Sequence, residues 1–158
     1  MTESQFDSKF PASKVFKNSC EKEDKRKYYL LKNGDTNKGF VIDIGCTRQL
    51  SKITLKNTRN AHLANRFVLS LYLCLATYDN FSFFFIFRGT EYFIIELSED
   101  NIHWVPVIYN QLQDARLLSC KNSPLEVFHF DLKFARFIRF RALSFYGLGA
   151  GLQYLNWE

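Results

Sequence analysis

The sequence predicts an all-β protein, built as an antiparallel β-sandwich. Short runs of alternating apolar and polar residues recur along the chain, which is typical of strands with one buried face. Polar turns such as residues 32–38 and 121–124 separate these runs, and residues 110–118 predict at most one helical turn. Aromatic residues make up 17% of the chain and favour a β-rich core over a helical bundle. A length of 158 residues fits one domain.

Seven runs predict strands. They are residues 39–45, 52–56, 91–98, 104–109, 125–132, 135–141 and 152–157. In the second run Ile53 and Leu55 face inward, whereas Lys52, Thr54 and Lys56 face outward.

The run at residues 135–141 does not keep a single register. Ile138 and Phe140 alternate with arginines, but Arg136 and Phe137 do not fit that alternation. We therefore expect a bulge or a local twist in this strand.

Five motifs along these strands follow the order of a known family. They are GFVIDIGC (39–46), ITLKNTRN (53–60), FIIELSED (93–100) with Trp104, ARFIRF (135–140) and SFYGLGAGLQY (144–154). Over roughly residues 28–157 this order resembles the coagulation factor V/VIII type C domain, also called the discoidin-like domain. The resemblance implies a galactose-binding-like jelly-roll β-sandwich over residues 28–158, preceded by an arm and loop at residues 1–27. It also implies a non-catalytic binding module.

Cofactors are not expected. Some members of the family hold calcium at an acidic Asp-Gly turn near the start of the domain, but residues 18–29 lack that turn. The four cysteines have no C-x-x-C spacing and no paired histidine, so no zinc site is expected and free thiols are favoured. Extracellular members commonly join the domain ends by a disulfide, for which this sequence has no cysteine after Cys120.

Residues 67–88 form an apolar stretch that interrupts the family pattern, since NAHLANR joins GTEYF without a gap when the stretch is removed. A membrane span would place Asp79 near its centre, at a cost of about 2.5–3.5 kcal/mol, and would put the two halves of the sandwich on opposite sides of the bilayer. A hairpin would expose a large apolar surface. We interpret the stretch as an insertion, and we favour a translated intron, with a natural loop insertion as the alternative. Both boundaries can be encoded as splice sites within the arginine codons of Arg66 and Arg88, and a whole number of codons lies between them.

By the resemblance, a ligand binds at loops at one end of the sandwich, formed by residues 57–66, part of 14–27 and 145–147. An aromatic ring face and planar hydrogen-bonding groups suit a sugar. The ligand-binding candidates are Asn57, Asn60, His62, Arg66 and Tyr146.

A structural role for these residues is the alternative. In that case the two asparagines bond the turn backbone, Tyr146 packs, and Arg66 and Arg136 pair with a buried carboxylate such as Asp43. Trp104 is a further structural candidate.

Catalysis has no support in the sequence. The three histidines lie far apart and no nucleophile motif accompanies them, while the glycines at residues 147–151 fit a turn better than a phosphate loop. His129 fits a strand position.

The partner expected first is a carbohydrate or glycoconjugate. An intracellular protein partner is the alternative, and a phospholipid head group at a membrane surface is the second alternative. The net charge of +5 comes from scattered basic residues, so no nucleic-acid partner is expected. The first residues carry no secretory signal, which predicts a cytoplasmic protein unless the chain is a fragment of a longer secreted one.

Overall fold

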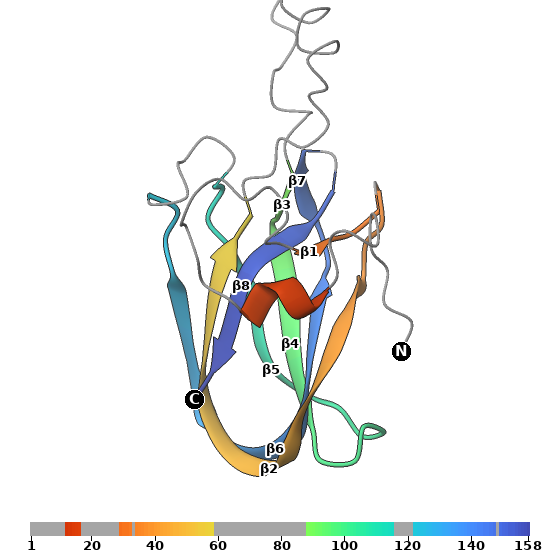
Figure 1. Ribbon diagram of the computed structural model, residues 1–158, viewed down its shortest axis with the longest axis vertical. Coiled ribbons are helices and arrows are strands. Elements are labelled where there is room, and N and C mark those ends of the chain that lie inside the picture. Colours follow the sequence, from red (N-terminus) through yellow and green to blue (C-terminus); the bar gives the residue numbers. More distant parts are fainter. Residues whose placement is uncertain (1–11, 17–28, 33, 59–87, 116–121, 148) are drawn as a thin grey trace, which may run out of the picture.

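The computed structural model describes residues 12–16, 29–32, 34–58, 88–115, 122–147 and 149–158. Within these ranges the chain forms one short 3₁₀ helix and eight strands (Figure 1). In chain order they are η1 (Ala12–Phe16), β1 (Tyr29–Leu30), β2 (Lys38–Asn57), β3 (Arg88–Thr90), β4 (Tyr92–Ser98), β5 (Val105–Gln111), β6 (Glu126–Ala142), β7 (Phe145–Gly147) and β8 (Gly151–Trp157). No helix in the described ranges is both long and apolar enough to cross a membrane.

Six of the described strands form one antiparallel sheet in the order β1-β8-β2-β6-β4-β5, and β3 pairs separately with β7. The long strands β2 and β6 pair with each other and bend together, so the sheet folds over into two layers (Figure 1). One layer holds β5, β4, the second half of β6 and the first half of β2. The other holds the first half of β6, the second half of β2, β8 and β1. The predicted antiparallel β-sandwich is confirmed.

The bend joins strands that the sequence predicts as separate. Residues 39–45 and 52–56 both belong to β2, and the predicted runs in the second half of the chain, 125–132 and 135–141, merge in the same way into β6. The exposed polar residues between the apolar runs resemble a turn, but the strand continues through them and pairs with β6 again from Arg48 onward.

An irregularity lies where the sequence predicts one, although the extra residues belong to the partner strand. Asp43 pairs with Phe137 and Arg48 with Ala135, so four residues of β2 face the single residue Arg136 of β6. Extra residues on one strand increase its local curvature, and β2 has a glycine with a φ of 88°, Gly45, at this point. Here the sheet turns from one layer into the other.

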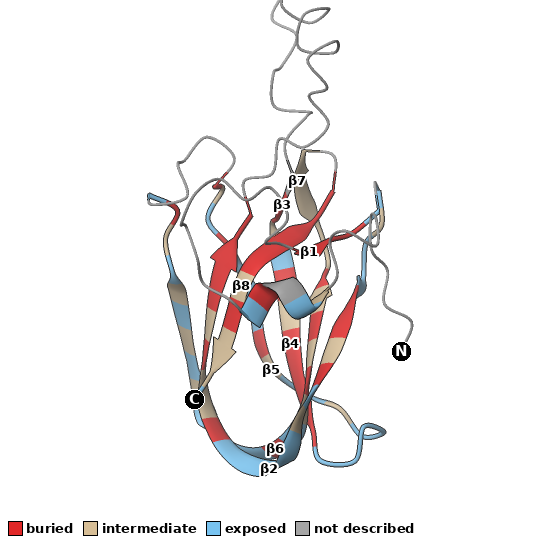
Figure 2. Ribbon diagram, viewed as in Figure 1, coloured by how far each residue is buried: buried red, intermediate tan, exposed pale blue. Residues whose placement is uncertain are grey.

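The core lies between the layers and contains aromatic side chains from three strands. Phe140 of β6 stacks against Phe40 of β2 and Phe93 of β4, with ring centroids 5.4 and 6.0 Å apart. Figure 2 shows the buried residues along the strands of both layers. Burying each such ring contributes about 1.5–3 kcal/mol to folding. Val15 of η1 belongs to the same cluster of buried residues, so the described part of the predicted N-terminal arm packs on the sandwich.

One local prediction is wrong, and the helical turn allowed at residues 110–118 does not form in the described part of that range, residues 110–115. Lys56 is buried, with 4% of its surface exposed, although its alternation predicts an outward, solvated position. Asn110 and Gln111 belong to strand β5 and not to a helical turn, and residues 112–115 are not helical either.

The sandwich has a bent end and a loop end. The bent end is where β2 and β6 turn between layers, together with the loop from β4 to β5. The loop end is the opposite end, where β2 finishes at Asn57 and β3 pairs with β7 (Figure 1). The predicted insertion at residues 67–88 lies outside the described residues, except for the backbone of Arg88 in β3.

Candidate functional site

The buried side chain of Asn57 holds together the backbone segments that form the base of the loop end. Its amide nitrogen donates to the carbonyl oxygens of Thr90 (2.7 Å) and Gln113 (3.0 Å). Its amide oxygen accepts the backbone N–H groups of Thr58 (3.0 Å) and Thr90 (2.9 Å). These four bonds use the hydrogen-bonding capacity of the amide, so Asn57 joins β2, β3 and the segment after β5 instead of facing a ligand.

The two chain ends that flank residues 59–87 lie next to each other at this end. A Cβ atom placed on Gly89 would lie 3.3 Å from the carbonyl oxygen of Thr58. Close packing continues at Gly151, where a Cβ atom would lie 2.6 Å from Thr58 and 2.7 Å from Leu30. The Thr90 hydroxyl donates to the Gly151 carbonyl at 2.7 Å, so the base of the loop end is tightly packed.

Tyr146 lies at the same end, in β7 and not in the turn that the sequence predicts. It pairs with Gly89 of β3 and is half-buried. Its hydroxyl donates to the carbonyl oxygen of Leu112 at 3.0 Å and accepts from the side-chain amide of Gln111 at 3.1 Å. The arrangement places an aromatic side chain and an exposed amide next to each other, which are the two groups that sugar recognition uses.

The remaining ligand-binding candidates, Asn60, His62 and Arg66, lie outside the described residues. The structure therefore brings two of the five candidates, Asn57 and Tyr146, to the loop end. Gln111 was not predicted. Its signal in the sequence is weak, because an amide at the end of a strand is common in turns.

The structural candidates Asp43 and Arg136 form an ion pair, but at the bent end. Arg136 donates from Nε and Nη2 to the two carboxylate oxygens at 3.0 and 2.9 Å. These bonds, together with the N–H of Gly45, hold the pKa of Asp43 below its usual range. Asp43 is exposed, so the expectation of a buried carboxylate at this position is wrong.

The buried carboxylate belongs instead to Glu96 of β4, which the sequence analysis did not single out. Glu96 is 6% exposed and accepts bonds from Arg139 (2.6 Å) and Arg141 (2.8 and 3.0 Å) of β6. Trp104 covers Arg139 from the β4–β5 loop, with the guanidinium 4.1 Å from the ring centroid. The signal for this site in the sequence is that Glu96 is the one charged residue of an apolar strand, while Arg139 and Arg141 occupy alternate positions of another strand.

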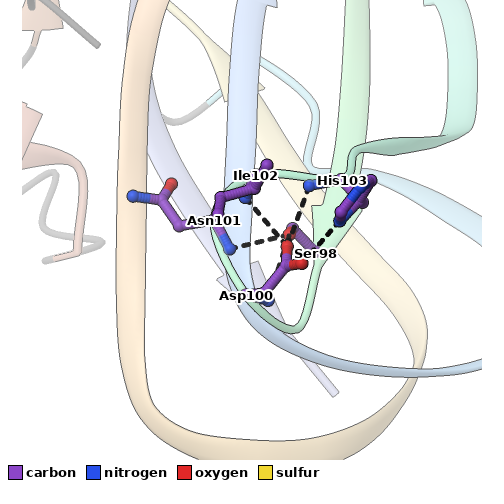
Figure 3. A network of polar contacts seen from close by, with 5 residues as sticks. All are labelled: Ser98, Asp100, Asn101, Ile102 and His103. Carbon is purple, nitrogen blue, oxygen red and sulfur yellow. Dashed lines mark hydrogen bonds and ion pairs between the residues drawn. The ribbon is translucent and has the colours of Figure 1, made fainter.

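Figure 3 shows the polar turn between β4 and β5 at the bent end. Asp100 accepts the backbone N–H groups of Ile102 and His103, each at 2.8 Å, and contacts the His103 ring nitrogen at 2.6 Å. Ser98 donates its hydroxyl to the same carboxylate at 3.0 Å. These hydrogen bonds lower the pKa of Asp100, and the bond to the His103 ring contributes most to the shift. Because the turn uses this carboxylate, the pair stabilises a loop and does not form an acid–base site.

A hollow of about 390 Å³ lies between this turn and the bend of β6, lined by Val105, Leu132 and Phe134 among others. No group of three or more His, Cys, Asp or Glu side chains in the described ranges could hold a metal ion. Cys46 is the free, exposed cysteine of the described ranges.

No protein-family model matches the chain, and no curated protein sequence matches it. Solved structures do match, over almost the whole length. The CBM32 module of AlyQ, in complex with 4,5-unsaturated mannuronic acid, has a TM-score of 0.59 at 14% identity, covering 99% of this chain and 92% of that module. The chitosan-binding module 1 of a chitosanase/glucanase from Paenibacillus sp. IK-5 has a TM-score of 0.60 at 12% identity, covering 98% and 89%.

A family 32 carbohydrate-binding module from Clostridium perfringens NanJ, in complex with galactose, has a TM-score of 0.58 at 15% identity and covers 98% and 89%. The chain has the galactose-binding-like fold. The jelly-roll sandwich that the sequence motifs imply is therefore confirmed.

Proposed function

We propose that this chain is a non-catalytic carbohydrate-binding module of the discoidin-like type, which holds a glycan at the loop end. The observation that carries the proposal is the position of Tyr146, hydrogen-bonded to the exposed amide of Gln111 at the end of a galactose-binding-like sandwich. A tyrosine ring can pack against the apolar face of a sugar, and the amide can bond its hydroxyl groups.

The loop candidates extend this site. Asn60, His62 and Arg66 lie a few residues after Asn57 in the sequence. Asn57 and Thr58 themselves lie at the base of the loop end. We assign them the polar contacts to the glycan, while Asn57 itself fixes the base of the loop. The neighbouring structures support a sugar as the ligand class, since they hold mannuronate, galactose and, in another C. perfringens module, GalNAc-β-1,3-galactose.

The described part of the chain offers little for catalysis. Glu96 and Asp100 are both used by internal bonds, and Asp43 is paired with Arg136. We therefore propose binding without turnover.

The test is binding of the purified chain to a fixed panel of sugars, measured by isothermal titration calorimetry and on a glycan array. The panel contains galactose, GalNAc-β-1,3-galactose, chitosan oligosaccharides and unsaturated mannuronate oligosaccharides. We expect saturable binding to at least one member, weakened by Tyr146→Ala and unaffected by Phe134→Ala at the bent end. Absence of binding across panel and array, or binding that Tyr146→Ala leaves intact, would overturn the proposal. Phosphatidylserine vesicles, run in parallel, test the phospholipid alternative.

A further inference from the structure

Two tyrosine rings lie on the outer face of the layer formed by β4 and β5. Tyr92 and Tyr109 stack with ring centroids 6.1 Å apart and an angle of 22° between the rings. Tyr109 is 68% exposed and Tyr92 37% exposed. The two rings form an aromatic surface on this face that a ligand can contact.

The pair continues toward the loop end through Gln111. Tyr109 and Gln111 are two residues apart on β5, so they share one face of the sheet with Cα atoms about 7 Å apart. Tyr92 is the cross-strand partner of Gln111, and the Gln111 amide donates to the Tyr146 hydroxyl at 3.1 Å. We call Tyr92, Tyr109 and Gln111 the tyrosine strip. The strip begins at Gln111, which contacts Tyr146, and runs away from the loop end along β5.

The strip itself carries no charged side chain, and the charged groups nearest to it in the sheet are held by hydrogen bonds within the protein. Arg141, on the strand next to β4, donates to Glu96 and to the side chain of Asn37. Glu91, next to Tyr92 in sequence, accepts from the Ser144 hydroxyl at 2.9 Å. An acidic or basic ligand would therefore find no free counter-charge on the strip.

We infer that the tyrosine strip holds the further units of a neutral oligosaccharide whose terminal unit lies at the loop end. This inference rests on the proposed function. The stacked pair of Tyr92 and Tyr109 offers an aromatic surface on which the apolar face of a sugar ring can pack, and the Gln111 amide, between Tyr146 and this pair, can bond hydroxyl groups. The substrate class is thus a chain of several neutral sugars, and not a single sugar or an acidic polymer.

Self-association through β5 is the other way to cover these rings, because β5 is the last strand at one edge of the sheet. Pro106 lies in that strand, and a proline has no N–H to donate to a neighbouring strand. A glycan laid on the face of the strand does not need that donor. The sequence of β5 thus favours the glycan over a second copy.

The experiment compares the affinity of the full chain for single sugars and for neutral oligomers. The probes are galactose, β-1,4-galactotetraose, N-acetylglucosamine and chitotetraose, titrated by calorimetry. We expect Tyr109→Ala to weaken binding of the preferred tetrasaccharide on the order of tenfold and to leave the single sugar unchanged. Tyr109→Phe keeps the ring and should behave as the wild type. Phe134→Ala, which removes a ring of similar exposure (58%) at the bent end, is the matched control.

The possible results separate this inference from the proposed function. If the wild type binds its tetrasaccharide and Tyr109→Ala binds it equally well, the strip is not a binding surface, although the loop-end site stands. If the wild type binds none of the probes or array glycans, both the proposed function and the inference on the tyrosine strip are wrong. A wild type that is dimeric by analytical ultracentrifugation, with Tyr109→Ala monomeric, assigns the strip to a second copy and overturns the inference.

Discussion

The guanidinium of Arg139 lies between Trp104 and Glu96, 4.1 Å from the ring centroid of the first and bonded at 2.6 Å to the carboxylate of the second. A guanidinium over an aromatic ring gains electrostatic attraction, and a bonded carboxylate orients it. The β4–β5 loop, β4 and β6 are therefore joined on the outer face of one layer. This relationship gives Trp104 a structural role.

Replacement of Glu96 by glutamine should destabilise the fold. It leaves Arg139 and Arg141 without a counter-charge in a largely buried position, and we expect the free energy of unfolding to fall by about 2–4 kcal/mol. Urea denaturation measures the loss. Asp43→Asn is the matched control, since its ion pair is exposed and should matter far less. Equal losses in both variants would contradict the assignment.

Acidification should remove the same stabilisation. Burial raises the pKa of Glu96, but the bonds and charges of Arg139 and Arg141 outweigh it and hold the pKa below its ordinary value of 4.5. The unfolded carboxyl takes up its proton at the ordinary value, so the contribution is complete above that value and declines as the pH falls through the folded pKa. Melting temperatures of wild type and Glu96→Gln, measured from about pH 7 to about pH 3, should converge at the acidic end. A constant difference would be evidence against this account.

Glu126 should show the opposite dependence. Burial raises its pKa, and the N–H of Gln113, which donates to it at 2.9 Å, only partly opposes this. Folding thus favours the protonated form, and that contribution is lost as the pH rises through the folded pKa. Glu126→Gln keeps the acceptor oxygen and removes the charge. It should raise the free energy of unfolding at neutral pH by less than about 1 kcal/mol and give no gain in acid. Destabilisation at neutral pH would refute this.

Asn57→Ala should lower stability by about 2–4 kcal/mol, because it leaves the backbone groups of Thr58, Thr90 and Gln113 without their partner. Chemical denaturation gives the value, and Asn156→Ala on the outer face of β8 serves as the control. A variant with unchanged stability but without sugar binding would return Asn57 to the ligand-binding residues.

Deletion of residues 67–88 should leave the sandwich folded. Thr58 and Gly89 lie next to each other, so residues 59–66 are long enough to connect them after the deletion. We expect the deletion variant to be monomeric, with a melting temperature at least equal to that of the full chain. Loss of cooperative unfolding would show that the stretch belongs to the fold.

Transcript sequencing across codons 60–95 tests the origin of that stretch. A spliced product that lacks codons 67–88 and restores one arginine before Gly89 supports a translated intron. A gene without GT and AG at those points excludes it.

The alternation of residues such as Ile53 and Leu55 was enough to predict the long strands, because every second residue of a strand with one buried face is apolar. The strands of two or three residues, β1, β3 and β7, are too short to show such a pattern. It could not predict that two strands continue through the bend, because Cys46 and its neighbours are exposed and polar like a turn. The burial of Lys56 could not be predicted for a related reason. Alternation gives the face of the strand on which a residue lies, but it does not show what packs over that face.

The site was harder to predict than the fold. Tyr146 belongs to the family motif, but its partner Gln111 lies 35 residues away in the sequence, so only the fold shows that the two side chains meet. Asp43 was assigned the buried carboxylate that belongs to Glu96, because short sequence windows do not show which carboxylate faces two arginines across a strand pair.

The bend of β2 and β6 has a consequence for how the protein loses its structure. Each layer contains one half of β2 and one half of β6, so the melting of either layer disrupts strands that the two layers share. Local opening is then confined to peripheral elements such as β1, β5 and the β3–β7 pair. Amide hydrogen exchange should find a single protected unit that spans both layers, and a mechanical pull on either terminus should meet one barrier.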